Sequence, residues 1–477
     1  MVVYPPGCSG HADDCGDTLM KKVHFIGIGG TGISAIARLL LERGWQVSGT
    51  DMQASPYYQA VTALGARTRL GHHPELVLQA DLVVRSSAVK DSDPEVQAAL
   101  EADIPVLKRS EFLPVLTENH QVLAVAGSHG KTTTTAMLVH LLRAAGQDPS
   151  FILGADIKGL NTNAHAGESL AFVIEADEYD YMFLGLEPLI SVITNIEYDH
   201  PDFFYTPEIY TQAFADFANK TKPEGALLIC ADDLGIHHML ETCELLPREM
   251  LSFGFFEEAD YQVVNHETYP AGQRFQVHLP DGKITDPFEL KLPGRFNVTN
   301  AVAALAAADR FGIEINNLRD AFSSFEGTNR RFDLAFQSEN VLIFNDYGHH
   351  PSQLAQTIAG TRELYPDHKI WAVWEPHTVS RTKRMRNQFA QALAEADQSV
   401  ILKLFGAREE DDTFSAESIA AEICKQNCRY LPEYDQAAGY ILENLSGKDL
   451  VIVFSAGRGP EFTELLCSKV KKEGLND

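Results

Sequence analysis

The sequence lacks several features that would each indicate a particular class of protein. It has no run of 18 or more apolar residues, so we expect no transmembrane helix. It also has no excess of positive charge, because 66 acidic residues outnumber 39 basic ones and give a formal net charge of −27. This charge argues against non-specific nucleic-acid binding, since the phosphate backbone requires a basic surface. Small anionic substrates are still compatible, because local clusters of amides and basic side chains bind them.

The seven cysteines are scattered, and no two of them form a Cys-x-x-Cys pair. This usage fits a reducing cytoplasm better than a disulfide framework or a zinc site. The first 20 residues lack the basic segment and apolar run of a signal peptide, and we expect them to be a poorly ordered extension. A chain of 477 residues is too long for one hydrophobic core, so several domains are expected.

Three stretches alternate apolar strands with amphipathic helices, as parallel sheets require. The first has a strand at 23–28, a helix at about 33–43 and a second strand that ends at Asp51; the others begin near residues 121 and 341. Between 251 and 290 the strands become short and alternating, which predicts a β-hairpin. We therefore predict an α/β fold whose three domains span the residues 21–117, 118–328 and 329–477.

A glycine-rich turn follows the first predicted strand and opens the first helix, with the pattern Gly27-x-Gly29-Gly30-x-Gly32. Glycines at such a turn let the backbone approach a diphosphate, whose charge meets free amides and the helix dipole. Asp51 ends the next strand, where a ribose hydroxyl would be recognised. This pattern alone also fits a dinucleotide-dependent oxidoreductase, and a nucleotide-sugar diphosphate would use the same contacts.

The segment AVAGSHGKTTTTAM at 124–137 has the form of a shortened phosphate-binding loop. The usual loop has a glycine five residues before Gly130, where this chain has Val125, and the nearer glycine is Gly127. The loop amides and Lys131 would hold the β- and γ-phosphates, and the Thr132 hydroxyl would reach Mg²⁺. The alternative is a glycine turn without function, which would leave the lysine and the threonines unexplained.

Acidic residues follow the next two predicted strands, in EADEYD at 175–180 and TNIEYDH at 194–200. Because the carboxyl ends of parallel strands meet at one edge, we expect these segments beside the phosphate loop. Carboxylates there would supply the oxygen ligands that Mg²⁺ prefers. A solvated acidic loop is the alternative for Glu175 and its neighbours, and a structural role is the alternative for His200.

Three further motifs lie in the second half of the chain: GRFNVTN at 294–300, NRRFD at 329–333, and the pair NDYGHHP at 345–351 and EPHTVSRT at 375–382. Spacing does not decide whether Asn297 caps a helix or recognises a base. Paired arginines at a domain junction are able to clamp a phosphate, although they are more often plain surface charge. The histidines and the arginine of the last pair would suit an anion and an amine.

In this order, GSHGKTTTT, EADEYD, TNIEYDH, GRFNVTNA, RRFD and DYGHHP resemble the motifs of the Mur ligases, the ATP-dependent amide ligases of peptidoglycan precursor synthesis. The resemblance covers about residues 22–460. It implies a Rossmann-like UDP-binding domain, a central P-loop-type ATPase domain with a mostly parallel sheet, and a C-terminal Rossmann-like domain. It is strongest to members that join UDP-N-acetylmuramate to L-alanine through an acyl phosphate, with ATP and Mg²⁺. A cytoplasmic monomer or homodimer, without nucleic-acid or membrane partners, is the further expectation.

The resemblance also implies roles for individual residues. The catalytic residues would be His129, Lys131, Glu175 and His200, and the Mg²⁺ ligands would be Thr132, Glu175 and His200. ATP would be bound by Gly127, Ser128, His129, Gly130, Lys131, Thr132, Thr133, Asn297, Arg331 and Asp346. The UDP-sugar would be bound by Gly27, Gly29, Gly30, Gly32, Asp51 and His72. The incoming amino acid would be bound by His349, His377 and Arg381, with Arg381 on its carboxylate.

The chain departs from the alanine-adding members at four places. Those members usually read PHRYSRT where this chain has Thr378 and Val379, so an arginine and an aromatic are missing beside the amino-acid pocket. Phe296 replaces a usual histidine, Asn345 replaces a usual aspartate, and SAGRGPEF differs from the usual C-terminal ending. A recycling ligase that attaches a ready-made peptide to UDP-N-acetylmuramate is therefore an alternative. An oxidoreductase is the alternative of another class.

Overall fold

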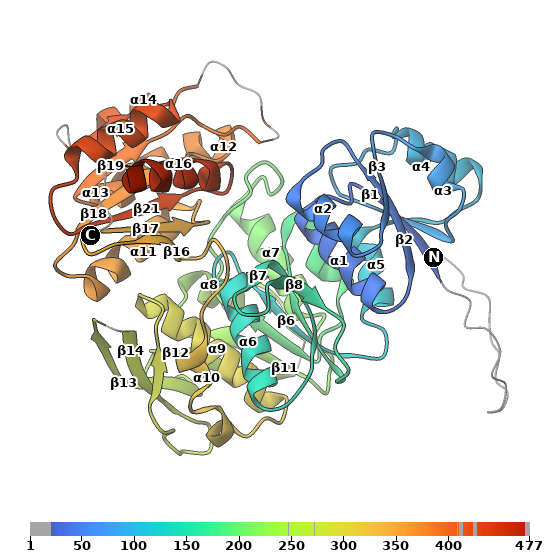
Figure 1. Cartoon of the computed structure of the whole chain (residues 1–477). Helices are drawn as coiled ribbons and strands as arrows, with labels where there is room; N and C mark the ends of the chain where they lie inside the picture. Colours follow the sequence, from blue (N-terminus) through green and yellow to red (C-terminus); the bar gives the residue numbers. More distant parts are fainter. Residues whose placement is uncertain are drawn as a thin grey trace.

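The computed structural model describes residues 21–246, 248–270, 272–407, 409, 414–422 and 427–472. The extension expected at residues 1–20 lies outside this part of the chain. The described residues form three α/β units, and the N-terminal unit (blue) and the C-terminal unit (orange to red) lie on the same side of the central one (Figure 1). Among these residues, no helix combines the length and the apolar character that a membrane span requires.

The N-terminal unit is a parallel sheet in the order β3-β2-β1-β4-β5. Its helix α1 begins at Thr31, two residues earlier than the sequence predicted, and buries one face through Ile33, Ile36 and Leu40. The elements are β1 (Lys22–Ile26), α1 (Thr31–Glu42), β2 (Gln46–Asp51), α2 (Pro56–Ala63), β3 (Arg67–Leu70), α3 (Pro74–Val77), β4 (Leu82–Arg85), α4 (Pro94–Glu101), β5 (Val106–Lys108) and α5 (Arg109–Leu116).

The central unit has a mixed sheet in the order β15-β14-β13-β12-β11-β10-β6-β9-β7-β8, parallel from β13 through β7. The predicted β-hairpin is confirmed as the antiparallel pair β13–β14. The elements are β6 (Gln121–Ala126), α6 (Lys131–Ala144), β7 (Ser150–Ile157), β8 (Thr162–His165), β9 (Ala171–Glu175), η1 (Tyr179–Gly185), β10 (Ile190–Ile193), α7 (Pro207–Ala218), β11 (Ala226–Cys230), α8 (Leu234–Thr242), β12 (Glu249–Gly254), β13 (Tyr261–Tyr269), β14 (Gly272–His278), β15 (Phe288–Leu290), α9 (Arg295–Arg310), η2 (Ile315–Leu318) and α10 (Ala321–Ser324).

The C-terminal unit has the strand order β16-β17-β21-β18-β19-β20, parallel except for the edge strand β16. The elements are β16 (Asp333–Gln337), β17 (Val341–Asp346), α11 (Pro351–Leu364), β18 (Lys369–Trp374), α12 (Val379–Arg384), α13 (Arg386–Ala394), β19 (Gln398–Ile401), α14 (Glu417–Glu422), β20 (Cys428–Tyr430), α15 (Tyr434–Asn444), β21 (Asp449–Phe454) and α16 (Gly459–Lys472).

The hydrophobic cores divide the molecule differently from the sheets. One continuous apolar cluster runs from Val23 in β1 to Phe325 after α10, so the N-terminal and central units share a core. Helix α1 contributes to it by packing on β7 and β8. The C-terminal unit has its own two clusters, one on each face of its sheet, which include Trp374 and Trp371 respectively. The site described below lies where this separate unit meets the other two.

Candidate functional site

The phosphate loop joins β6 to α6 and is shaped by two glycines with positive φ. Gly127 (φ +140°) and Gly130 (φ +81°) adopt backbone conformations that side chains disfavour. A Cβ at Gly127 would lie 2.0 Å from Thr194 Oγ1, and one at Gly130 would lie 2.5 Å from Asn300 Oδ1. No larger residue fits at either position. The loop is therefore built on close backbone approach, as a phosphate-binding turn requires.

Lys131 opens helix α6, and its ammonium group is held by two oxygens of the central unit. Its Nζ donates to the Gly127 carbonyl at 2.5 Å and to Glu178 Oε2 at 2.7 Å. Burial opposes the charge, but the carboxylate of Glu178 outweighs it and raises the pKa of Lys131. The lysine is therefore charged, and both Lys131 and Glu178 line the cavity. A bound phosphate would replace Glu178 as the partner of the ammonium group.

Thr132 and Glu175 come together from α6 and the end of β9. The Thr132 hydroxyl donates to Glu175 Oε1 at 2.9 Å, and the Gly154 amide donates to Oε2 at 2.6 Å. Burial raises the pKa of Glu175 despite the nearby charge of Lys131. A hydroxyl beside a carboxylate is the oxygen donor set that Mg²⁺ prefers, so these two residues fit the metal that the sequence implies.

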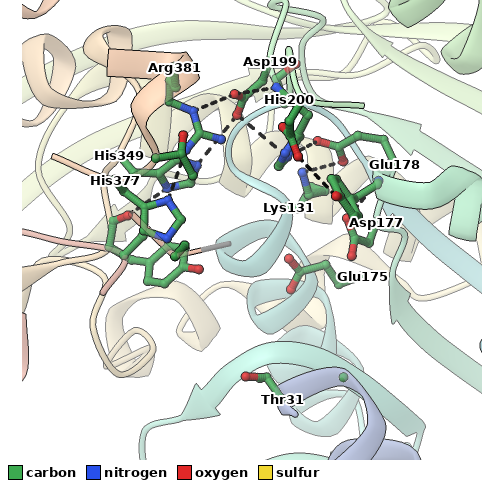
Figure 2. Close-up of a pocket in the computed structure, with 18 of the residues that line it drawn as sticks. Thr31, Lys131, Glu175, Asp177, Glu178, Asp199, His200, His349, His377 and Arg381 are labelled. Carbon is green, nitrogen blue, oxygen red and sulfur yellow. Dashed lines mark hydrogen bonds and ion pairs between the residues drawn. The ribbon is translucent and has the colours of Figure 1, made fainter. Parts of the chain in front are cut away.

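His200 lies on the other side of Lys131 from Glu175 (Figure 2). Its Nε2 is 3.8 Å from Glu178 Oε1 and 3.9 Å from Asp199 Oδ2. The residue has a positive φ of 53°, so the chain turns sharply at the end of the TNIEYDH segment. His200 thus faces acidic groups of the same cavity without touching the Thr132–Glu175 pair.

Asp199 joins the central unit to the C-terminal unit. Its Oδ1 accepts a hydrogen bond from Arg381 Nε at 2.8 Å, and both side chains are buried. His349 Nε2 is 3.7 Å from Asp199 Oδ2. Figure 2 shows Asp199 between this pair on one side and His200 on the other. Burial disfavours the charged form of Asp199, but Arg381 outweighs it and holds the pKa of Asp199 well below its ordinary value. Burial and the charge of Arg381 both hold the pKa of His349 well below its ordinary value.

All three units contribute to one cavity of about 430 Å³. The N-terminal unit supplies Gly30, Thr31 and Gly32, and Thr31 lies at the end of the view in Figure 2 opposite Arg381. The charged side chains that line it comprise six acids and four bases: Glu175, Asp177, Glu178, Asp199, Asp202, Glu409, Arg109, Lys131, Arg331 and Arg381. A smaller cavity beside it is lined by His129, Gly130, Thr133, Asn297, Arg331 and Asp346, among others.

Three family models match the chain in succession. They are the Mur ligase family catalytic domain at residues 22–121, the Mur ligase middle domain at 125–308 and the Mur ligase glutamate ligase domain at 330–457. The chain belongs to the Mur ligase family. The predicted family resemblance and the three-part α/β fold are thereby confirmed.

Named relatives of this Mur ligase cover nearly the whole chain. It is 37% identical over 452 residues to the UDP-N-acetylmuramate–L-alanine ligase of Paenarthrobacter aurescens, which spans 94% of this chain and 97% of the relative. It is 34% identical to the enzyme of the same name from Caldanaerobacter subterraneus, with 95% and 98% covered. The solved UDP-N-acetylmuramate–alanine ligase of Thermotoga maritima superposes with a TM-score of 0.80 at 25% identity, covering 95% and 99%.

The structure gathers the residues that the sequence assigned to ATP at the junction of the central and C-terminal units. Asp346 accepts hydrogen bonds from the Gly348 and Phe332 amides, and burial raises the pKa of its carboxyl. Asn297 donates to the Pro293 carbonyl at 2.7 Å, so it also secures the start of α9. These residues line the smaller cavity together with Arg331.

The residues that the sequence assigned to the UDP-sugar divide between two places in this Mur ligase. Gly27, Gly30, Asp51, His72 and Lys90 line a cavity of about 570 Å³ in the N-terminal unit, and Gly30 also lines the central cavity. Asp51 Oδ2 already accepts a hydrogen bond from the Gly29 amide at 2.8 Å, which shapes the turn. Gly32 instead lines the central cavity, where a Cβ would lie 2.0 Å from Arg109 Nη1.

Sequence reasoning missed several residues of the site. Arg109 bonds Asp177 at 3.0 Å, yet it stands in KRSEF, a segment without any motif signal. Tyr210 of α7 is buried and bonds both Ser128 Oγ (2.9 Å) and Glu178 Oε1 (3.3 Å). Glu178 lay within the quoted EADEYD segment, but nothing in its spacing marked it as the partner of the loop lysine.

Proposed function

We propose that this Mur ligase joins UDP-N-acetylmuramate to L-alanine. The reaction is ATP + UDP-N-acetylmuramate + L-alanine → ADP + phosphate + UDP-N-acetylmuramoyl-L-alanine. The observation that carries the proposal is that the phosphate loop, the strand-end carboxylates and the Arg381 cluster line one cavity. The first two groups would serve phosphoryl transfer, and the third would serve the attack of the amine. The relatives that bear this activity in their names, at 34–37% identity over nearly the full chain, support it.

In the first step, the muramate carboxylate oxygen attacks the γ-phosphorus of ATP and the bond to the β-phosphate oxygen breaks, which releases ADP and leaves an acyl phosphate. A carboxylate is a poor nucleophile toward a polyanion, so the site must neutralise charge. Lys131 carries its charge beside the loop, and Arg331 lines both cavities. These two cations would hold the γ-phosphate between the central and C-terminal units.

In the second step, the amine nitrogen of the amino acid attacks the acyl carbon. The tetrahedral intermediate then collapses with loss of phosphate, and the nitrogen gives up a proton to leave a neutral amide. Arg381 would bind the carboxylate of the incoming amino acid through the terminal nitrogens of its guanidinium, since its Nε is occupied by Asp199. His377 lies beside it, with Nδ1 at 3.4 Å from Arg381 Nη1.

Thr132 and Glu175 would hold a Mg²⁺ ion, and His200 would contribute to a second one. When bound, Mg²⁺ neutralises the charge of phosphate oxygens. The Thr132–Glu175 contact supplies the donor chemistry that this ion prefers. A cytoplasmic location and a monomeric or homodimeric state stay predictions.

A recycling ligase that transfers a ready-made peptide is the second candidate, and Thr378 and Val379 favour it. These residues replace an arginine and an aromatic in the amine-facing segment, where smaller side chains leave more room. The oxidoreductase alternative is dropped, because the family assignment accounts for the glycine-rich turn together with the phosphate loop.

The test is phosphate release from ATP in the presence of UDP-N-acetylmuramate and a panel of amines: L-alanine, glycine, L-serine and a tripeptide. We expect L-alanine to give the highest kcat/KM. Release with the tripeptide alone would overturn the proposal in favour of the recycling reaction. Amide product identified by mass must accompany the phosphate, since hydrolysis of the acyl phosphate releases phosphate too.

A further inference from the structure

The C-terminal unit meets the rest of the molecule through polar contacts and through packing of α11 on Gly294 and β13. Among the described residues, no buried apolar cluster spans both this unit and the central one. The ties include the Asp199–Arg381 pair and the Lys158–Asp333 pair, with N–O distances of 2.8 and 2.7 Å. A third tie is formed by Glu197, which has no role in the chemistry described above. Polar ties of this kind are able to form and break without the cost of opening a core.

Glu197 lies in the loop after β10 and contacts two units at once. Its Oε2 is 2.9 Å from His129 Nε2 in the phosphate loop. Its Oε1 accepts a hydrogen bond from the hydroxyl of Ser352, which stands in the first turn of α11. His350 Nδ1 is 3.7 Å from Oε2. We call these four residues, Glu197, His129, Ser352 and His350, the carboxylate clasp.

The clasp is built for a charged carboxylate. Burial opposes ionisation of Glu197, but the hydrogen bond with His129 and the neighbouring histidine and serine outweigh it and lower its pKa to about 2. Ser352 stands in the first turn of α11, so the carboxylate lies near the helix N-terminus, where the helix dipole favours negative charge. Glu197 is therefore an anion across the whole physiological pH range, held by both units.

The phosphate-loop end of the clasp is held rigidly. The His129 amide donates to Asn195 Oδ1 at 2.9 Å, and the Asn195 side-chain amide donates back to the His129 carbonyl at 2.9 Å. The Glu197 amide donates to Ser128 Oγ at 2.8 Å. Residues 194–197 and the phosphate loop are therefore joined by several hydrogen bonds. A displacement of the Glu197 side chain would move His129 as well.

We propose that Glu197 is a positioning residue that couples docking of the C-terminal unit to the phosphate loop, with Ser352 as its contact on the docking unit. When the C-terminal unit docks, the Ser352 hydroxyl and the N-terminus of α11 come into contact with one carboxylate oxygen of Glu197. This contact orients the carboxylate so that its other oxygen bonds His129. The loop then holds the γ-phosphate in place only when the unit that carries Arg381 is present. ATP cleavage is thereby confined to the arrangement in which the amine site is assembled, which limits loss of the acyl phosphate to water.

The experiment is a double-mutant cycle with Ser352→Ala, Glu197→Gln and both changes, measured as kcat and KM for each substrate. The kinetic part rests on the proposed function. Ser352→Thr restores a hydroxyl, and Ser468→Ala, an exposed serine of α16, is the matched control for the substitution itself. We expect Ser352→Ala to lower kcat about 10- to 100-fold, the range for a lost hydrogen bond to a charged group, with KM for UDP-N-acetylmuramate nearly unchanged.

Because the two residues act through one contact, the double variant should lose no more than the worse single variant. Ser352→Thr should recover most of the rate, and Ser468→Ala should match the wild type. Additive losses, or wild-type kcat in Ser352→Ala, would overturn the coupling role of Glu197.

A second measurement does not depend on the amine. Small-angle X-ray scattering with a non-hydrolysable ATP analogue should show a decrease in radius of gyration for the wild type and a smaller decrease for Ser352→Ala. Equal compaction of the two would overturn the inference. Absence of amide product from the wild type with every amine of the panel would overturn the proposed function alone. The scattering comparison would still test whether the carboxylate clasp couples docking to the phosphate loop.

Discussion

Replacing Arg381 by methionine should expose how strongly the Asp199–Arg381 pair holds the C-terminal unit. The pair is 2.8 Å long, and the two side chains are only 4% and 2% exposed. After the change, Asp199 keeps the backbone amide of His200 at 2.7 Å and the more distant His349 at 3.7 Å. The amide carries no formal charge, and burial still opposes protonation of His349 after Arg381 is removed. Leaving a buried carboxylate without its partner costs about 3–5 kcal/mol, whereas methionine preserves most of the side-chain volume.

The assay is urea-induced unfolding followed by tryptophan fluorescence, since Trp371 and Trp374 both lie in the C-terminal unit. We expect Arg381→Met to lower by about 3–5 kcal/mol either the free energy of unfolding of that unit or the free energy that holds it against the central unit. A second change, Asp199→Asn, should recover much of the loss because no charge is then left buried. A loss below about 1 kcal/mol would be the behaviour of an exposed ion pair and would refute the reasoning.

The pH dependence of the same pair has a definite sign. The pKa of Asp199 is lower in the folded protein than in the unfolded chain, where it is about 3.9. The stabilisation is therefore fully present above the unfolded value and is lost as the pH falls toward the folded value. Arg381→Met should lack this component, so the stability difference between wild type and variant should shrink in acid.

Three further changes test other parts of the site. Lys131→Ala should abolish amide formation, as measured by product mass, while calorimetry still detects nearly unchanged UDP-N-acetylmuramate binding; retained turnover would remove Lys131 from the γ-phosphate. Glu175→Ala should lose most of its kcat, and titration with excess Mg²⁺ should restore it only partly, because the Thr132 hydroxyl alone is a weak ligand. His350→Phe should make the free energy of unfolding less dependent on pH in the acid range, as measured by urea unfolding at several pH values. The pKa of His350 falls by burial to about 4, so the wild type loses up to about 1.4 kcal/mol per pH unit as the pH drops from about 6.5 to 4. An identical acid limb in variant and wild type would contradict this assignment.

The parts of the site that lie at strand ends could be predicted from the sequence. Glu175 ends β9, Lys131 and His200 come after β6 and β10, and these three strands are neighbours in the central sheet. Apolar strands that end in polar residues reveal this edge without any knowledge of tertiary structure, because parallel strands end together. The β-hairpin was predictable for a similar local reason, since alternation has the period of a half-buried strand.

The contacts between units could not be predicted in the same way. Asp199 and Arg381 are 182 residues apart, and Glu197 and Ser352 are 155 apart. No local pattern distinguishes them from the neighbouring charged and polar residues, since their meaning depends on how a separate unit docks. The core shared by the N-terminal and central units is hidden for the same reason, because apolar periodicity identifies a buried face but not the element that covers it.

The acidic character of the cavity explains how Lys131 and His200 depend on each other. In this structure Lys131 neutralises Glu178, whose side chain is only 1% exposed. When a phosphate draws Lys131 away, Glu178 keeps the Tyr210 hydroxyl at 3.3 Å and His200 Nε2 at 3.8 Å. A buried carboxylate left without a cation would be costly, so a metal ion bound beside His200 would lower the cost of moving Lys131 from Glu178 to ATP. Because six acids still face four bases around the cavity, binding of a triphosphate and a carboxylate there requires further positive charge. That requirement is an electrostatic reason, independent of any motif, to expect divalent cations with the substrate.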